Sequence, residues 1–167
     1  RDWITSRGLG DVYKRQRELG TRFYEIIDNH EAIENFIDVL DVDNSGYKII
    51  LPGVELNDRA STDSWYHRMI GGYFNGSHMI YSVDLESSSE ETAVAKIVLI
   101  WSASVWKAPA AKSQSVNILT YTTWTVGKVS EGGVGGLKVL ARTKLTDLIL
   151  HPVHRSKLPT DEVKVER

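Results

Sequence analysis

The chain of 167 residues contains no cysteine. A disulfide, a thiolate nucleophile and a cysteine-ligated metal are therefore excluded, and the absence fits a cytoplasmic location. No apolar run approaches the roughly 20 residues that a membrane-spanning helix needs, so we expect no membrane partner. No internal repeat is visible in the sequence. These absences leave a soluble globular protein as the class that the composition favours.

The first 16 residues do not read as native protein. The stretch SRGLGDVYKRQ, residues 6–16, resembles the end of a common transposase-based sequencing adapter translated in frame, and residues 1–5 fit the primer and index before it. We therefore interpret residues 1–16 as an artefactual leader and exclude them, as is done for a fusion scar. The alternative is a genuine basic N-terminal arm, of a kind that other proteins carry.

Excluding the leader changes the charge balance. The whole chain has a net charge of −2, whereas residues 17–167 hold 16 basic and 20 acidic residues, a net charge of −4. A mildly acidic charge balance disfavours a nucleic-acid partner, because proteins usually bind nucleic acids through a basic surface. The remaining 151 residues are of the usual size for one domain.

The first half of the remaining chain predicts helices. Apolar side chains recur at intervals of three and four over residues 17–40, which indicates two helices, or one bent helix, meeting near Asp28 and Asn29. Residues 61–74 predict a further helix, capped by Ser61 or Thr62 and stopped by two glycines. Between them, YKIILP is a short β run that ends at Pro52.

The second half predicts strands. Residues 78–86, 92–106, 113–126 and 137–145 are rich in Val, Ile, Thr and aromatic side chains. Odd positions from 93 to 105 are all apolar, so one face of that strand should pack while the other is partly wet. The charged tail, residues 151–167, is expected to be loosely ordered. Helices followed by antiparallel strands predict an α+β fold with an apolar interior, a common ligand site.

This order of elements resembles the SnoaL-like family of the nuclear-transport-factor-two superfold, which includes polyketide cyclases, ketosteroid isomerases and scytalone dehydratase. The resemblance covers residues 17–150 and rests on three stretches: FYEIIDNHEAIENFIDVL, SWYHRMIGGYFNGSHMIYSVDLE and GGLKVLARTKL. It implies a cone-shaped α+β fold, with a curved antiparallel sheet wrapped on three N-terminal helical segments. It also implies a small hydrophobic or aromatic ligand in the cone, and an isomerase, cyclase or dehydratase that works by acid–base catalysis without a cofactor.

A second relative on the same scaffold is the small β subunit of ring-hydroxylating dioxygenases. Its Y-x-x-P strand is similar to the stretch from Tyr47 to Pro52, and its last strand is similar to LARTKLTDLIL. In those enzymes the iron and the Rieske centre lie in the partner α subunit. This resemblance implies a non-catalytic structural subunit with a larger catalytic partner. Under either resemblance, a homodimer through the sheet is expected.

Two residues are candidates for proton transfer. His78 opens the long strand, where scytalone dehydratase carries a catalytic histidine, and an imidazole exchanges protons near neutral pH. Asp28 lies at the junction of the opening helices, where it could orient the His78 imidazole or act as a base itself. The structural alternatives are a histidine that hydrogen-bonds a nearby loop and an aspartate that caps a helix.

Further residues are candidate ligand contacts because aromatic, thioether and polar side chains could line the cone: Tyr24, His30, Trp65, Tyr66, Met69, Asn117 and Tyr121. Core packing is the alternative for the aromatic ones, and a place on the wet face is the alternative for Asn117. No metal is predicted, because HPVH in the tail lacks a third ligand and DVDNSG lacks the glutamate of a calcium loop. The NGS at Asn75 is a turn signal before it is a glycosylation site.

Overall fold

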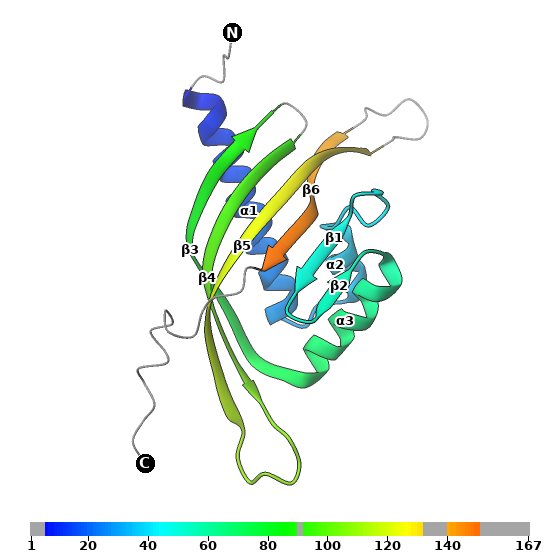
Figure 1. Cartoon of the computed structure of the whole chain (residues 1–167), viewed down its shortest axis with the longest axis vertical. Helices are drawn as coiled ribbons and strands as arrows, with labels where there is room; N and C mark the ends of the chain where they lie inside the picture. The colour runs from blue at the N-terminus through cyan, green and yellow to red at the C-terminus, as the bar shows by residue number, and fades with distance from the viewer. Residues whose placement is uncertain (1–5, 90–91, 132–139, 151–167) are drawn as a thin grey trace.

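The computed structural model describes residues 6–89, 92–131 and 140–150. Its elements are α1 (Ser6–Asp28), α2 (Ile33–Asp38), β1 (Lys48–Leu51), β2 (Val54–Leu56), α3 (Arg59–Gly72), β3 (Tyr73–Ser88), β4 (Thr92–Val105), β5 (Gln114–Glu131) and β6 (Leu140–Leu150) (Figure 1). The predicted order of helices before long strands is confirmed, and β2 was not expected from the sequence. The tail predicted to be loose lies outside the described residues.

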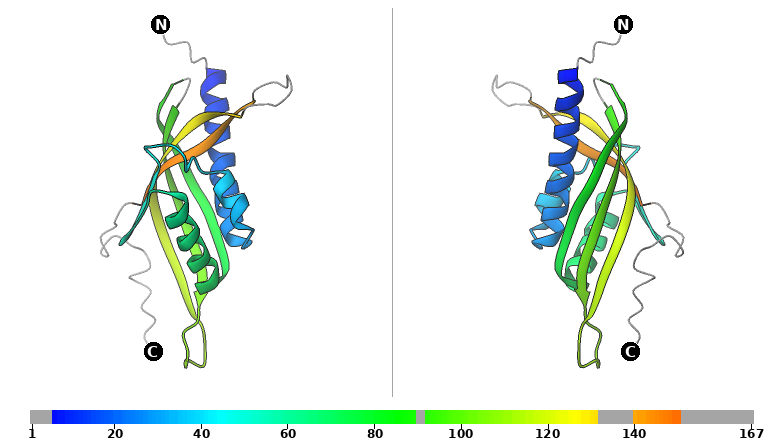
Figure 2. Two further views of the ribbon diagram at one scale, coloured as in Figure 1. Left: turned by 90° about the vertical axis from the view of Figure 1, so that its right-hand side faces the viewer. Right: turned by 90° about the vertical axis from the view of Figure 1, so that its left-hand side faces the viewer.

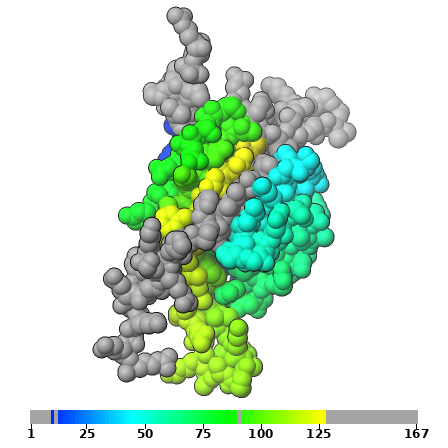
Figure 3. Space-filling view, in the orientation of Figure 1, coloured from blue at the N-terminus to red at the C-terminus, as the bar shows by residue number. Residues whose placement is uncertain are grey.

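The strands form one sheet in the order β2-β1-β6-β5-β4-β3. The long strands pair antiparallel, as predicted, whereas β1 joins β6 in parallel. Side views show the long strands bending while α1 lies along one face of the sheet (Figure 2). The loop between β4 and β5 projects beyond the body (Figure 3). None of the helices in the described part of the chain is long and apolar enough to cross a membrane.

The core forms where α1 packs on the sheet. Ala95, Ile97 and Leu99 on β4 are buried, while Lys96 between them is exposed, so the alternation predicted for this strand is confirmed. Trp124 on β5 is 0% exposed and forms the centre of the core. It packs against the buried stripe of α1, which consists of Phe23, Tyr24, Ile26 and Ile27. The interior of the cone is therefore largely filled by the chain's own side chains.

The start of α3 differs from its prediction. Asp58 is the N-cap: its carboxylate accepts a hydrogen bond from Ser61 N at 2.7 Å, and Ser61 Oγ accepts one from Asp58 N at 3.3 Å. This reciprocal pair is a capping box, so the predicted cap at Ser61 or Thr62 is wrong. Thr62 is buried instead, and its hydroxyl lies 2.8 Å from the Tyr47 hydroxyl. The helix ends at Gly72, as predicted.

Helix α1 runs without a break from Ser6 to Asp28, across the boundary predicted after residue 16. Gln16, the last residue of the leader, is only 1% exposed. Its Oε1 is buried without a hydrogen-bond partner in the described structure. Buried polar atoms in native proteins nearly always have partners, so a residue foreign to its position would look like this. The artefactual origin of residues 1–16 stays a prediction.

Gln16→Leu is expected to raise the free energy of unfolding by about 1–3 kcal/mol, because a buried polar atom without a partner is destabilising by that amount. Urea denaturation followed by circular dichroism measures it. Arg17→Leu is the control, since Arg17 is exposed on the same helix and its replacement should stay within about 0.5 kcal/mol. Equal stability of Gln16→Leu and the unmodified chain would contradict the prediction.

Candidate functional site

The turn after α1 fixes the position of Asp28, the last residue of that helix. Glu31 N donates to the Ile26 carbonyl at 3.0 Å, and His30 N donates to the Ile27 carbonyl at 3.1 Å. These are the paired hydrogen bonds of a Schellman motif. His30 occupies its left-handed position with φ of 49°, where glycine is usual. The chain therefore adopts an unfavourable backbone conformation two residues after Asp28.

Asp28 ends a helix and does not cap one. Helix α2 begins at Ile33 after Ala32, without a side-chain cap, so the structural alternative of a capping Asp28 is wrong. A carboxylate in the last turn lies at the negative end of the helix dipole, which is unfavourable. No basic side chain lies in the last turn of α1 to offset it. The position of Asp28 is therefore not explained by the stability of its own helix.

The Asp28 carboxylate binds His78 through both oxygens. His78 N donates to Oδ2 at 2.9 Å, and His78 Nδ1 lies 2.6 Å from Oδ1. Because an ionised carboxylate only accepts hydrogen bonds, Nδ1 carries the proton, and the lone pair of the neutral ring is left on Nε2. The side chains are 9% exposed for His78 and 18% for Asp28. The predicted pairing is thus confirmed, while a catalytic role for it stays a prediction.

Aromatic rings hold the His78 imidazole on both sides. Tyr24 stacks on it with ring centroids 4.4 Å apart, and Trp101 stacks at 6.0 Å. Tyr73 in turn meets Trp101 edge-on at 5.0 Å. Burial raises the pKa of the Tyr24 hydroxyl, and hydrogen bonds with Trp124 and Thr122 offset this only in part. Tyr24 therefore remains a neutral phenol that positions the imidazole by contact.

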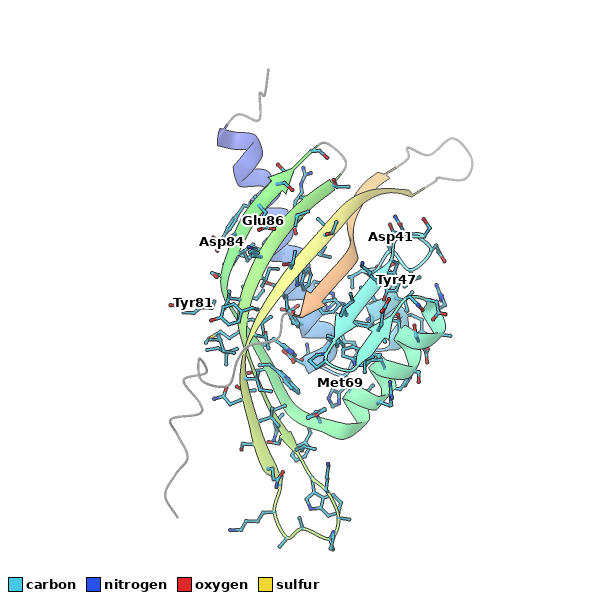
Figure 4. All side chains as sticks on the ribbon, in the orientation of Figure 1. Asp41, Tyr47, Met69, Tyr81, Asp84 and Glu86 are labelled. Carbon is cyan, nitrogen blue, oxygen red and sulfur yellow. The ribbon has the colours of Figure 1, made fainter. Side chains whose placement is uncertain are left out.

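A small hollow opens beside the Asp28–His78 pair. Asp28 lines it from the end of α1, His30 from the turn that follows, and Tyr73 and Trp101 from the sheet. Met69, labelled in Figure 4, lines the hollow from α3. Its volume is about 10 Å³, near the least that holds one water molecule. The hollow thus combines apolar walls with two ionisable side chains, Asp28 and His30, while His78 adjoins it through its contact with Asp28. The hollow is too small in this conformation for a larger molecule.

Other predicted contacts lie elsewhere. Tyr66 is fully buried, and Trp65 stacks on Phe36 in the core with centroids 6.2 Å apart. Asn117 and Tyr121 pair with the outward-facing positions of β4, so their side chains lie on the outer face of the sheet and not in the cone. For these four residues the structure supports core packing or surface exposure, and it does not bring them to the hollow.

Tyr66 nevertheless supports the site from behind. Its hydroxyl donates to the carbonyls of Ile26 at 3.1 Å and Glu31 at 2.6 Å, and so ties α3 to the turn that follows Asp28. The Glu31 carboxylate accepts two hydrogen bonds from Arg22, at 2.7 and 2.8 Å, and one from Asn35. These bonds lower the pKa of Glu31 and fix both sides of the turn.

Trp101, Tyr73 and Gly76 are residues of the site that the sequence did not single out. Trp101 belongs to the apolar face of its strand, and that pattern marks it as core without showing that it lies next to His78. Tyr73 and Gly76 precede the strand predicted from residue 78, so they were assigned to a helix end and a turn. Only the pairing of β3 with β4 brings them to the hollow.

No protein-family model and no curated protein sequence matches the chain. Several solved structures, however, are similar to this chain. A proposed scytalone dehydratase from Novosphingobium aromaticivorans superposes with a TM-score of 0.70 at 12% identity, over 90% of this chain and 89% of that one. A proposed dehydratase of the NTF2-like family from Streptomyces avermitilis has a TM-score of 0.66 at 16% identity, over 86% of this chain and 99% of that one. A proposed aromatic ring hydroxylase, also from N. aromaticivorans, has a TM-score of 0.66 at 12% identity, over 83% of this chain and 86% of that one.

These similarities define the fold. The helices packed on a curved sheet form the α+β cone of the nuclear-transport-factor-two-like superfold, as the sequence resemblance predicts. At identities of 10–16% they carry no activity from those proteins to this one. One scaffold of this kind hosts many functions, so function must be argued from the site.

Proposed function

We propose that this domain binds a small, flat, largely apolar molecule at the mouth of the cone and moves a proton on it, in the manner of an isomerase, cyclase or dehydratase. The observation that carries the proposal is the carboxylate of Asp28 held 2.6 Å from His78 Nδ1 beside a hollow. Two residues that line this hollow sit where they disfavour folding: the Asp28 carboxylate lies at a helix C-terminus, and His30, two residues later, has a left-handed backbone conformation. Departures from local preference gather at functional sites.

The geometry suits general acid–base catalysis. His78 Nε2 is the proton acceptor: a C–H bond of the bound molecule breaks, an N–H bond forms, and the electron pair passes to an adjacent carbonyl oxygen as an enolate. Asp28 stabilises the resulting imidazolium through Nδ1–H. The same imidazole returns the proton to another carbon, or to a leaving hydroxyl group. His30, which also lines the hollow, is the second group available to carry a proton.

Binding requires the hollow to widen. Met69 lines it from α3 and is only partly buried. A methionine side chain has three rotatable bonds and repacks readily, so it is the wall that can move most easily. Tyr73 and Trp101 would then provide flat surfaces for a ring. A flat molecule fits this site better than a branched one.

The test uses 1-tetralone, 2-naphthol and estrone as probes of three flat classes. Thermal unfolding reports binding, since a ligand at a hundred times its Kd adds about 2.7 kcal/mol to stability. Exchange of the α protons of 1-tetralone in D2O, followed by NMR, reports proton abstraction. We expect the unmodified chain to bind and to accelerate exchange, and His78→Ala to lose the exchange while keeping its fold.

His67→Ala is the matched control. His67 also pairs with an aspartate, Asp63, at 3.1 Å, but it is more than half exposed on α3 and, unlike Met69 two residues later, does not line the hollow. Its replacement should leave exchange and binding unchanged. Equal losses in His67→Ala and His78→Ala would refute the assignment of His78. If no probe shifts the unmodified chain and none exchanges, the small-molecule function is overturned in favour of the second candidate.

The second candidate is a non-catalytic subunit whose outer sheet face binds another chain. Its support is the filled interior of the cone and the exposed apolar side chains on the outer face, Met79, Tyr81 and Tyr121. Tyr81 is 74% exposed and projects away from β3 (Figure 4). A homodimer is the simplest form of such an assembly. The molecular mass in solution, measured by light scattering, distinguishes a monomer from that dimer.

A further inference from the structure

We propose that the Asn75–Gly76 bulge in β3 is the device that positions the Asp28–His78 pair, with Gly76 as a positioning residue. The space left by its missing side chain is the space that the Asp28 carboxylate enters. The proposal deepens the proposed function and rests on it for its catalytic purpose. Its structural content, the dependence of one hydrogen bond on one glycine, is tested separately.

The bulge is visible in the register. Phe74 pairs with Ser104 and Ser77 pairs with Ser102, so two residues of β3, Asn75 and Gly76, lie opposite one residue of β4. Asn75 has φ of 51°, a left-handed conformation inside a strand. Extra residues of this kind bend a strand and re-aim the side chains that follow. Here His78, two residues after Gly76, is the histidine of the site.

The position of β3 in the sheet explains why Asp28 can reach His78. Strand β3 is the edge of the described sheet, so the outward N–H of His78 has no neighbouring strand to bond. The Asp28 carboxylate takes that N–H at 2.9 Å and the ring Nδ1 at 2.6 Å. An edge group that would otherwise be unpaired thus holds the carboxylate in place.

Gly76 leaves the room for this contact. A Cβ at position 76 would lie 3.2 Å from Asp28 Oδ1, the oxygen that faces His78 Nδ1. It would also lie 4.0 Å from the Asp28 Cα, so the carboxylate would have to move while its backbone stays close. The φ of Gly76 is not in the left-handed region, and alanine is therefore allowed by the backbone. Glycine is therefore required for a steric reason: a Cβ at position 76 would crowd Asp28 Oδ1.

The experiment compares Gly76→Ala with Gly72→Ala in the full chain. A Cβ at Gly72 meets nothing within 4 Å, which makes that exposed glycine a matched control a few residues away. The readout is the His78 Nδ1–H proton resonance in H2O, assigned by its loss in His78→Ala, with the tautomer read from ¹⁵N–¹H correlations. We expect the resonance to persist in Gly72→Ala and to be lost in Gly76→Ala. Its persistence in folded Gly76→Ala would overturn the proposal.

A second measurement covers the case in which Gly76→Ala folds poorly. The midpoint of thermal unfolding is compared for Gly76→Ala in the unmodified chain and in Asp28→Ala. If the methyl group clashes with the carboxylate, Gly76→Ala lowers the midpoint in the first background and leaves it nearly unchanged in the second. Equal lowering in both would show that the glycine is needed for another reason.

Neither readout depends on a reaction. Loss of the resonance in Gly76→Ala together with an unmodified chain that exchanges no tetralone protons would leave the positioning intact while the proposed function fails. Conversely, an active enzyme whose Gly76→Ala variant keeps both the resonance and full exchange would support the function and refute the role of the bulge.

Discussion

Trp124→Ala is expected to lower the free energy of unfolding by about 3–5 kcal/mol, the range for truncating a large buried aromatic side chain. Trp124 is 0% exposed and lies 5.1 Å from Phe23 and 5.7 Å from Tyr24 between ring centroids. Its Nε1 donates to Thr122 Oγ1 at 3.0 Å. The substitution leaves a cavity and removes a partner of a buried hydroxyl at once. The free energy of unfolding of a native domain is about 5–15 kcal/mol, so this substitution would remove much of it.

Trp106→Ala is the matched control for this measurement. Trp106 is 53% exposed at the start of the β4–β5 loop, where its Nε1 donates to the Ala110 carbonyl at 2.8 Å. Its loss should lower stability by no more than about 1 kcal/mol, roughly one exposed hydrogen bond. Urea unfolding followed by far-ultraviolet circular dichroism compares the variants without relying on tryptophan fluorescence. A loss for Trp124→Ala as small as that for Trp106→Ala would contradict the central place of Trp124 in the core.

Trp124 also connects the core to the site. It contacts Tyr24, which stacks on the His78 imidazole, which in turn stacks beneath Trp101. The imidazole is thus one ring of a contiguous series that begins in the centre of the cone. Because packed rings move together, its orientation depends on the core as well as on Asp28. A rigid support of this kind is what precise proton transfer requires.

The helices and the long strands could be predicted from periodicity because each buries one regular face. The odd positions of β4 are an example: Ala95, Ile97 and Leu99 are buried as the alternation indicates. The start of β3 could not be predicted. Asn75 followed by glycine favours a left-handed residue, which serves a turn and a bulge equally well. Only pairing with β4 decides between them, and that pairing is not encoded locally.

The candidate site could be predicted in part. The resemblance indicates His78, and the position of Asp28 at the junction of the opening helices makes it a candidate to orient that imidazole; the two side chains do meet across 50 positions of sequence. Asn117 and Tyr121 were expected to contact a ligand, yet the strand register turns them outward. A shift of one residue in register exchanges the two faces of a strand, so polarity alone could not assign them. Trp101 shows the reverse: an ordinary core pattern conceals a residue of the site.

Asp28→Asn is expected to slow the exchange of 1-tetralone protons about 10²–10⁴-fold while the protein stays folded. The amide keeps the size of the carboxylate, but it carries no charge to stabilise the imidazolium. It can also donate to His78 Nδ1, which would move the ring proton to Nε2 and remove the base. Relief of the charge at the C-terminus of α1 adds about 0.3–1 kcal/mol to stability, and the weaker hydrogen bonds to His78 remove about 1 kcal/mol, so stability should stay nearly unchanged.

Asp63→Asn provides the comparison, since Asp63 pairs with the exposed His67 in the same chemical arrangement away from the hollow. That variant should exchange tetralone protons at the rate of the unmodified chain. The decisive signature in Asp28→Asn is a large loss of exchange with little change of stability. A residue that only holds the fold would lose both together. An unchanged exchange rate in Asp28→Asn would remove Asp28 from the reaction and leave His78 without its proposed orienting partner.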